Sequence, residues 1–459
     1  MPNLYRTQSR ASGTNGLERV REVAKKDGKV KFTALLHHVS IDLLRESYHS
    51  LKKQAAPGVD GVTWQEYGEG LEARLSDLHG RIHRGAYRAQ PSRRIWIPKA
   101  GGKQRPIGIA TLEDKVVQHA VGTVLNQIWE EDFKGFSYGF RPGRGQQDAL
   151  DALYVGIVRK KVNWIVELDI RSFFDKLQHE WLIQFVEHRI GDGRILRLIQ
   201  QWLKAGVLEQ EQWSETKEGS PQGSVISPML ANLYLHHVLD LWVDSWRKKQ
   251  THGDVIIVRY ADDAVLGFEH QADAARFLEQ LRERLGKFGW ELHPEKTRLI
   301  EFGRYAAERR KKRGEGKPET FQFLGFTHIC GTNHTTGNFT VDRKTIGKRM
   351  TAKLKDLRVE LRKRMHERVE GTLKWLQQVV RGYFQYHAIP GNWDRMNGFH
   401  KEVQRLWYMA LRRRSQRCRL TWTEFCERLG SLLPPVATQQ PYPDRRFDAK
   451  HIQGRNRVR

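Results

Sequence analysis

Two adjacent carboxylates, Asp262 and Asp263, are the residues of this chain whose type and spacing point most directly to chemistry. They lie between two apolar runs, 255–258 and 264–268, which are typical of buried strands. Because a tight turn tolerates Asp, we predict a hairpin that holds both carboxylates at one end of a sheet. A divalent cation would relieve their repulsion, and oxygen ligands favour Mg²⁺ or Mn²⁺ over zinc. The alternative is a solvated turn in which Asp only bonds nearby backbone.

A third carboxylate, Asp169, follows another apolar run at residues 164–168. If both runs are strands of one sheet, we expect the three aspartates to meet at its end and to hold two metal ions. Such a pair of ions activates a hydroxyl nucleophile and stabilises a leaving pyrophosphate during an in-line phosphoryl transfer.

Three segments together resemble a known family. Residues 169–174, Asp-Ile-Arg-Ser-Phe-Phe, and residues 260–263, Tyr-Ala-Asp-Asp, are similar to the two palm motifs of reverse transcriptases. The intervening residues 219–235 begin Gly-Ser-Pro-Gln-Gly and resemble the same stretch of group II intron-encoded reverse transcriptases, also called intron maturases. Ordered motifs run from about residue 34 to about residue 400, so the resemblance covers most of the chain.

The resemblance implies an RNA-directed DNA polymerase that extends a DNA primer on an RNA template with deoxynucleoside triphosphates. It also implies a maturase that assists splicing and retrohoming of a group II intron, with the intron RNA and a DNA target as partners. The implied fold is α+β, a right-hand polymerase with fingers, a palm of mixed antiparallel sheet and helices, and a helical thumb. The implied boundaries are an N-terminal extension at 1–88, fingers and palm at 89–335, a thumb at 336–414 and a basic nucleic-acid-binding appendage at 415–459.

The resemblance also assigns roles at the catalytic centre. Asp169, Asp262 and Asp263 would bind two Mg²⁺ ions, with Mn²⁺ as a substitute, and the Ile170 carbonyl would be a further ligand. Phe174 matches a steric gate whose ring lies under the sugar and excludes a 2′-hydroxyl. In an alternating strand Phe173 and Phe174 face opposite ways, so we expect one ring to pack and the other to line the site. The plain alternative for either ring is core packing.

Further residues match positions that contact the nucleotide. Residues 93–109 read as a basic hairpin with a glycine turn that resembles the fingers, where Lys99 and Arg105 would neutralise the triphosphate. Gln222 would lie beneath the nascent base pair, and Lys296 matches a general acid for the pyrophosphate. A solvated hairpin, a plain Pro-Gly turn and an exposed turn lysine are the respective alternatives.

Three short segments would contact template and primer. The residues are Tyr138 and Arg141 in the block 137–142, Gly223 in the Pro-Gln-Gly loop, and Phe323 and Gly325 in a segment that resembles the primer grip. Glycine at these places allows a close backbone approach to a strand. Without the resemblance, residues 323–326 are only a short apolar strand.

Regular patterns place further elements. A helix is predicted from Pro228 to about Trp246, and helices with a basic outer face are predicted from about 344 to 414, where apolar residues recur at three- and four-residue steps. The charged residues 309–318 are predicted to form an exposed loop.

Composition independently indicates a polyanionic partner. The chain has 79 Lys and Arg against 53 Asp and Glu, a formal charge of +26. Three cysteines without a CxxC pair indicate neither a disulfide framework nor a zinc site, so we expect a reducing bacterial cytoplasm, with association to the nucleoid when DNA is bound. No apolar stretch approaches 18 residues, so no membrane partner is expected.

One departure from the family pattern stands out. The Cys/His-rich endonuclease found at the end of many family members has no counterpart here, so retrohoming would take its primer from a replication fork or an existing nick. Two other functions fit the sequence. One is a splicing-only RNA-binding maturase with a vestigial site, and the other is a domesticated reverse transcriptase that acts in DNA repair.

Overall fold

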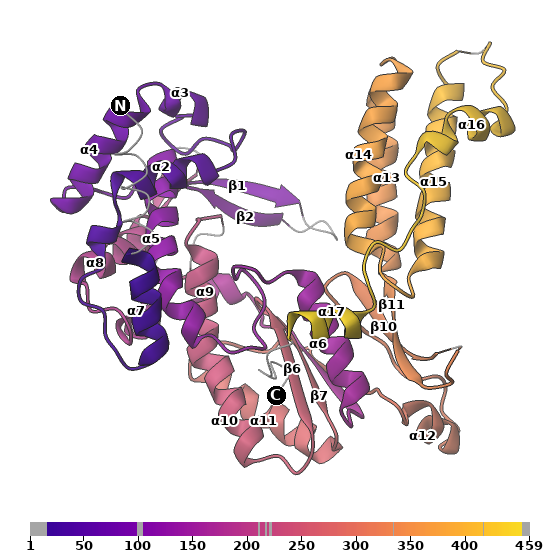
Figure 1. Ribbon diagram of the computed structural model, residues 1–459, viewed down its shortest axis with the longest axis horizontal. Coiled ribbons are helices and arrows are strands. Elements are labelled where there is room, and N and C mark those ends of the chain that lie inside the picture. The colour runs from indigo at the N-terminus through magenta and orange to yellow at the C-terminus, as the bar shows by residue number, and fades with distance from the viewer. Residues whose placement is uncertain are drawn as a thin grey trace.

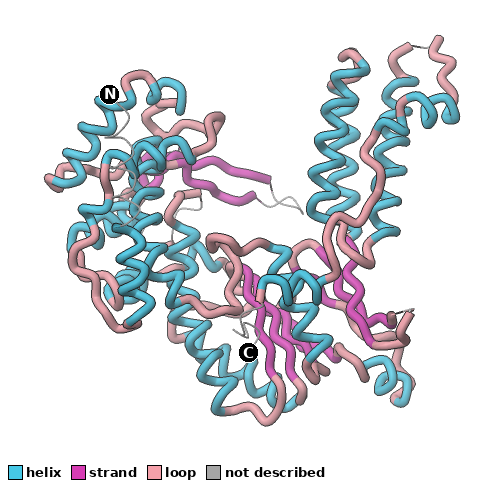
Figure 2. Tube along the Cα trace, in the orientation of Figure 1, coloured by secondary structure: helices cyan, strands magenta, loops and turns pink. Residues whose placement is uncertain are grey.

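The computed structural model describes residues 16–98, 104–209, 212–215, 218–219, 223–333, 335–415 and 417–451. Helices and largely antiparallel sheets alternate along the chain (Figures 1 and 2), so the predicted α+β class is confirmed. The strands form three sheets, ordered β2-β1-β4-β5, β6-β7-β3-β8 and β11-β10-β9. Among the described helices, none has both the length and the apolar character needed to cross a bilayer.

The sheet β6-β7-β3-β8, called the central sheet below, contains the predicted apolar runs. Its strands are β3 (Trp164–Leu168), β6 (Val255–Tyr260), β7 (Asp263–Phe268) and β8 (Arg298–Glu301). Because β3 pairs antiparallel with β7, in a register that puts Leu168 opposite Ala264, the end of β3 meets the start of β7. The predicted hairpin and the strand before Asp169 are therefore both present at one end of the sheet.

Alternate residues of the central sheet pack into two layers. Ile165 and Val265 join a cluster with helix α6 (Gln146–Arg159), whereas Val166 and Leu266 join the larger core. That larger core includes α11 (Gln271–Gly286). The predicted helix from Pro228 is interrupted: α9 (Ser227–Leu235) and α10 (Leu241–Lys249) are joined by a π-helical turn, His236–Asp240. Such turns often occur at functional sites.

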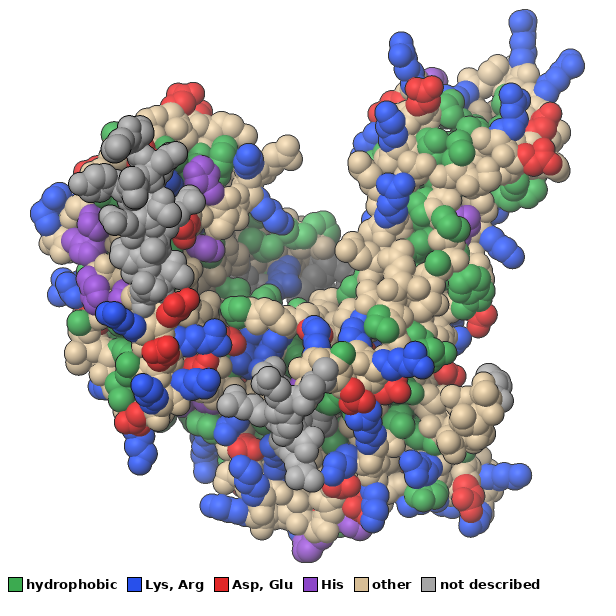
Figure 3. All heavy atoms as spheres, in the orientation of Figure 1, with side chains coloured by type: hydrophobic (Ala, Val, Ile, Leu, Met, Phe, Trp, Pro, Cys, Tyr) green, Lys and Arg blue, Asp and Glu red, His purple; other side chains and the backbone are tan. Residues whose placement is uncertain are grey.

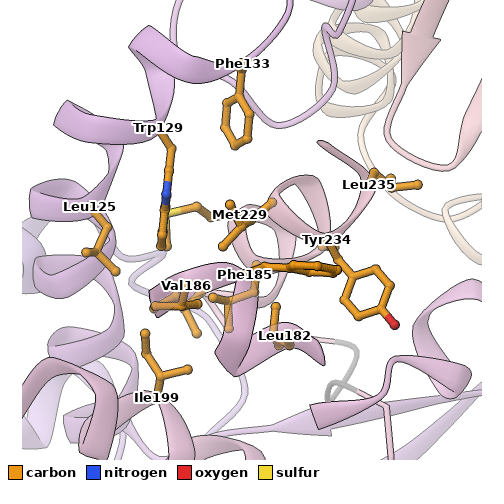
Figure 4. Close-up of a cluster of buried hydrophobic side chains, with 14 of the residues drawn as sticks. Leu125, Trp129, Phe133, Leu182, Phe185, Val186, Ile199, Met229, Tyr234 and Leu235 are labelled. Atoms are coloured by element: carbon orange, nitrogen blue, oxygen red, sulfur yellow. The ribbon is translucent and has the colours of Figure 1, made fainter. Parts of the chain in front are cut away.

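The N-terminal half forms a helical body around one apolar core. Its helices are α2 (Ile41–Ser50), α3 (Trp64–Gly68), α4 (Leu71–His83), α5 (Leu112–Asp132), α7 (His179–Glu187) and α8 (Gly193–Lys204). Trp129 of α5, Phe185 of α7 and Tyr234 of α9 meet in that core (Figure 4), and the rings of Phe185 and Tyr234 are 5.2 Å apart. The predicted hairpin projects from this body as β1 (Ser92–Pro98) and β2 (Gln104–Ile109), with β4 (Val207–Glu209) and β5 (Gln212–Ser214) beside it.

The C-terminal part begins with α12 (Ala306–Lys312), followed by β9 (Phe321–Phe323), β10 (Phe326–Thr332) and β11 (Phe339–Thr345). The exposed loop predicted at 309–318 is therefore partly wrong, because its first residues end a helix. The helices α13 (Gly347–Lys363), α14 (Val369–His387) and α15 (Trp393–Arg412) confirm the helical prediction and stand apart from the N-terminal body (Figure 1).

The described part of the chain beyond residue 414, predicted as a basic nucleic-acid-binding appendage, packs against the rest of the protein. After α16 (Trp422–Arg428) it runs back along the α13–α15 helices, and α17 (Pro443–Lys450) packs on α6 (Figure 1). Arg446 bonds the buried Asp151, and Phe447 enters the cluster on the α6 side of the central sheet. The described tail is thus part of the folded body, an arrangement set by contacts nearly 300 positions apart that no local pattern reveals.

Candidate active site at the end of the central sheet

The turn between β6 and β7 presents two of the aspartates. Tyr260 pairs with Asp263, so Ala261 and Asp262 form the turn, and Ala261 has a φ of 56°. The backbone of Gly139 packs against this turn so closely that a Cβ there would lie 2.3 Å from the nitrogen of Ala261. The turn therefore has little freedom, and Asp262 is held at its tip.

A buried arginine holds the turn from the protein side. Arg259 is fully buried and donates to both carboxylate oxygens of Asp240 at 2.7 and 2.6 Å. Its Nη1 also donates to the Ala261 carbonyl at 2.9 Å and to Asn232 Oδ1 at 3.1 Å, and its Nη2 donates to Ser137 Oγ at 2.6 Å. Because Asp240 lies in the π-helical turn, the helix interruption and the aspartate turn are parts of one network.

The partners in this network were not predicted, although the sequence contains one signal of them. Arg259 interrupts a strand whose preceding residues, 255–258, are all apolar. A charge in the interior of a buried strand requires a buried partner. Asn232, within the apolar helix α9, is the same kind of signal.

The three aspartates lie close enough to affect one another's ionisation. Burial raises the pKa of Asp262, and repulsion from Asp169 raises it further. The side chain of Asp263 is exposed at the two cavities beside the sheet, but the protein around it limits its hydration and raises its pKa to about 6, with added repulsion from Asp262 and Asp169. Lys296 and Arg349 oppose that rise. A cluster of carboxylates that resists ionisation is stabilised by any cation placed among them.

The donor set fits a hard divalent cation, although the side chains do not surround a common point. Carboxylate oxygens are the ligands that Mg²⁺ and Mn²⁺ prefer. Across the described ranges, no group of three or more Asp, Glu, His or Cys side chains is already placed to hold an ion. Instead, Nζ of Lys296 lies 2.7 Å from Oδ2 of Asp169. An ammonium group thus neutralises one of the three carboxylates.

Two cavities adjoin the aspartates. The first, of about 490 Å³, is lined by Arg105, Phe174, Gly223 and Asp262 among others. The second, of about 350 Å³, is lined by Asp169, Lys296, the segment 322–325 and others. Asp263 and Arg349 line both cavities. The surface is hollowed between the N-terminal body and the α13–α15 helices, with basic side chains in the hollow (Figure 3).

The two phenylalanines after Asp169 divide between core and cavity. Phe173 is 2% exposed and packs against Trp290, whereas Phe174 is half-buried and lines the first cavity. The expected alternating strand is wrong, because these residues form a 3₁₀-helix, Phe173–Lys176. The rings nevertheless separate, and they meet edge to face at 4.9 Å.

Of the residues predicted to contact the nucleotide, some lie within the described ranges and others do not. Arg105, on β2, is exposed at the first cavity, and its charge stabilises the ionised form of Asp262. Ile170 is 5% exposed, directly after Asp169. Lys99 and Gln222 lie outside the described residues. Gly223 has a φ of 117°, and a Cβ there would lie 2.6 Å from the Gly108 carbonyl oxygen, so the backbone at Gly223 packs tightly against β2.

The segment 137–142 holds Tyr138 and Arg141, which were predicted to contact template or primer, with their side chains inside the protein. The side chain of Arg141 is 1% exposed, pairs with Glu130 at 2.9 Å and donates to the carbonyls of Lys134 and Ser137. Tyr138 is 3% exposed and belongs to a core cluster. Both side chains therefore shape the loop from within, and the exposed ring of the segment is that of Phe140, at 54%.

The segment 323–326 combines core packing with a lining backbone. Phe323 is 4% exposed and packs in the core, while Gly325, with a φ of 86°, lines the second cavity. A Cβ at Gly325 would lie 3.2 Å from Nη1 of Arg349, so this arginine is next to the segment. Arg349 was not among the predicted site residues, because nothing local distinguishes it from the other basic residues of α13.

Comparisons with known proteins agree with this arrangement. Residues 97–328 match the family described as reverse transcriptase (RNA-dependent DNA polymerase). Protein YkfC of Escherichia coli K12 is 34% identical over 285 residues, which cover 54% of this chain and 74% of that protein. The group II intron-encoded protein LtrA of Lactococcus lactis is 34% identical over 224 residues, 48% of this chain and 37% of that protein. Nuclear intron maturase 4 of Arabidopsis thaliana is 32% identical over 122 residues, 26% of this chain and 15% of that protein.

Proposed function

Because the chain belongs to the reverse transcriptase (RNA-dependent DNA polymerase) family, we propose that it copies RNA into DNA by two-metal nucleotidyl transfer. The observation that carries the proposal is the trio Asp169, Asp262 and Asp263 at one end of the central sheet, where the pKa of Asp263 is raised to about 6. Such a cluster of carboxylates beside a cavity is suited to bind divalent cations.

The aspartates would hold the cations, with the Ile170 carbonyl as a further ligand. Bound Mg²⁺ or Mn²⁺ supplies the Lewis acidity that lowers the pKa of a primer hydroxyl and stabilises the leaving pyrophosphate. Asp169 would exchange the ammonium of Lys296 for a cation. Lys296 would then be free to bind the triphosphate and to donate a proton to the pyrophosphate. Arg259 holds the Asp262 turn in place throughout.

The first cavity would receive the incoming deoxynucleotide. Arg105 and Lys99 would neutralise its phosphates, and the ring of Phe174 would lie under the sugar and exclude a 2′-hydroxyl. Gln222 and Gly223 would lie beneath the new base pair. The buried Tyr138 and Arg141 would act by holding the loop that approaches the template.

The second cavity would receive the end of the primer. Phe323 would support the segment from the core, and Gly325 would approach the strand with its backbone. Arg349, beside Gly325 and Asp263, would contact a primer phosphate.

A maturase role with a group II intron RNA and a DNA target forms the second half of the proposal. The relatives that are intron-encoded proteins or maturases by name support it, as does the charge of +26. The chain spans only about a third of LtrA, so this role is proposed for the region that the two proteins share.

The test is extension of a DNA primer on an RNA template with deoxynucleotides and Mg²⁺. The parent protein should extend the primer, and Asp262→Asn should abolish extension while RNA affinity is retained. Asp77→Asn, the same change at an exposed position on α4, is the control and should be active. A parent that binds RNA and promotes splicing without extending a primer would overturn the polymerase proposal and favour a splicing-only protein.

A further inference from the structure

A further cavity lies at the opposite end of the central sheet from the aspartates. It has a volume of about 610 Å³ and is formed by the end of α6, the start of β3, the start of α11 and the residues around α12. Trp164, the first residue of β3, lines it, whereas Asp169 follows the last residue of the same strand. A strand of five residues spans roughly 16 Å. The cavity, called the back pocket below, is therefore separate from the two cavities at the aspartates.

The back pocket has a cationic lining. Six Lys and Arg side chains and two carboxylates, Glu269 and Glu301, line it. A surplus of this kind attracts anions, and it attracts a polyanion most strongly because several charges are attracted at once. The whole chain has the same sign of surplus, but here the cations gather around a hollow.

Three of these cations are held loosely. Lys161 has a side chain that is 78% exposed, with Glu269 at 3.9 Å. Arg304 is exposed and donates to the Val158 carbonyl at 3.3 Å, and Arg309 lies 4.0 Å from Glu301. By contrast, Arg159 at the edge of the pocket makes two short bonds to Asp448, at 2.8 and 2.7 Å. Loosely held cations can turn to a ligand at little cost, because no strong ion pair must be broken.

An exposed aromatic ring stands among these cations. Tyr305 is 48% exposed, directly before α12, and the guanidinium of Arg309 lies 5.8 Å from its ring centre. Its backbone is fixed nearby, since a Cβ at Gly303 would lie 2.1 Å from the Val162 carbonyl oxygen. The half-buried ring of Trp164 adds a second aromatic surface to the wall. An exposed ring beside weakly paired cations has the composition of a site that stacks a base and pairs with phosphates.

We propose that the back pocket binds a single-stranded polynucleotide at the same time as the cleft at the aspartates holds a template and primer. One base would stack on Tyr305, and Lys161, Arg304 and Arg309 would contact the phosphates. The site goes beyond the polymerase function proposed above, because none of its residues reaches the aspartate end of the sheet; only the simultaneous binding of a template and primer rests on that function.

The test measures binding while the cleft is filled. The full chain is saturated with an unlabelled template–primer duplex, and the anisotropy of a fluorescent single-stranded RNA is followed as protein is added. Tyr305→Ala should weaken this binding about tenfold, the order expected for loss of one base–aromatic stack. Tyr305→Phe should restore it. Arg304→Ala should weaken it and lower the salt dependence by about one phosphate contact.

The control is Lys312→Ala. Lys312 is on α12, is 75% exposed and is paired with Glu308 at 2.7 Å, so the change removes the same charge outside the pocket. It should leave binding unchanged.

The proposal is overturned if Tyr305→Ala binds the RNA as tightly as Lys312→Ala does, or if the duplex displaces the RNA from the parent protein. A DNA strand used in place of RNA shows which polynucleotide the site prefers. Primer extension by Tyr305→Ala should equal that of the parent. The RNA-binding result can therefore be interpreted even if the parent protein does not extend a primer.

Discussion

Nζ of Lys296 donates a 2.7 Å hydrogen bond to Oδ2 of Asp169, so an ammonium group lies against one of the three carboxylates that we propose as metal ligands. The same lysine lowers the pKa of Asp263. One positive charge therefore compensates part of the repulsion in the cluster. In the proposed mechanism, the same lysine would link metal binding to the proton that the departing pyrophosphate needs.

Replacing Lys296 with Met should separate these two roles. Because the ammonium competes for Asp169, Mn²⁺ should bind the variant at least as tightly as it binds the parent. Extension should slow by about a hundredfold or more, because a general acid is lost. Electron paramagnetic resonance of free Mn²⁺ and single-turnover extension measure the two effects. Lys296→Arg, which keeps the charge with a much higher pKa, should keep nucleotide binding but not the rate; full activity of Lys296→Met would contradict the acid role.

Arg259→Met should destabilise the fold and disorder the Asp262 turn. Removal of the guanidinium leaves the fully buried Asp240 uncompensated, which costs about 3–5 kcal/mol. Urea unfolding measures this loss. The double variant Arg259→Met with Asp240→Leu should recover most of the stability and still lack activity, because the Ala261 carbonyl loses the hydrogen bond from Arg259. An active double variant would show that the network only stabilises the fold.

The sequence predicts the aspartate hairpin but not the Arg259 network that holds it, and both outcomes have the same physical reason. The strands around Asp262 follow from a local apolar pattern, and β3 before Asp169 follows from the same pattern. The partners of Arg259 come from a helix, a π-helical turn and a loop, up to 122 positions away. Only the packed fold brings these groups together, so the sequence could indicate that Arg259 needs a partner but not which one.

The same reasoning accounts for the differences at other positions. The sequence around Phe173 and Phe174 does not distinguish a 3₁₀-helix from a strand. In either structure the side chains of two neighbouring residues point in different directions. Burial of Arg141 depends on Glu130 in the preceding helix, and docking of α17 depends on Asp151. Each of these contacts is specified by packing between segments rather than by local propensity.

Phe174→Ala should admit ribonucleotides, because removal of the ring opens space under the sugar. The ratio of ribonucleotide to deoxynucleotide incorporation in primer extension should rise by at least tenfold, with little change in stability. Phe173→Ala is the matched control, since its ring is 2% exposed in the core. That variant should lose about 3–5 kcal/mol of stability, with unchanged sugar selectivity. Equal selectivity in both variants would rule out Phe174 as the gate.

Metal binding should weaken as the pH falls through about 6. The pKa of Asp263 in the folded protein is raised to about 6 from its ordinary 3.8, so the carboxylate takes up a proton in this range and loses its affinity for a cation. In the metal-free protein the free energy of unfolding depends on pH in the opposite direction. Between about pH 4 and 6 the folded state binds more protons than the unfolded state, so this group stabilises the fold as the pH falls and the benefit is lost as the pH rises through 6.

Titration of Mn²⁺ affinity between pH 5 and 7.5 and urea unfolding of the metal-free protein measure the two trends. Asp263→Asn should bind Mn²⁺ more weakly at pH 7.5, and both pH dependences should be smaller in this window, with the remainder contributed by Asp262. If the parent binds Mn²⁺ equally at pH 5 and 7.5, the three carboxylates do not act as a coupled cluster.

Arg349→Ala should weaken binding of a template–primer duplex and reduce its salt dependence. The guanidinium lies beside Gly325 and lines both cavities at the aspartates, so its loss should remove about one phosphate contact and lower the salt slope by about 1. The pKa of Asp263 should rise further, because Arg349 favours its ionised form. Lys248→Ala, at a lysine that is 66% exposed and paired with Asp244, serves as the charge-matched control. If both variants lose the same amount of duplex affinity and of its dependence on salt concentration, Arg349 contributes only through the overall positive charge of the protein.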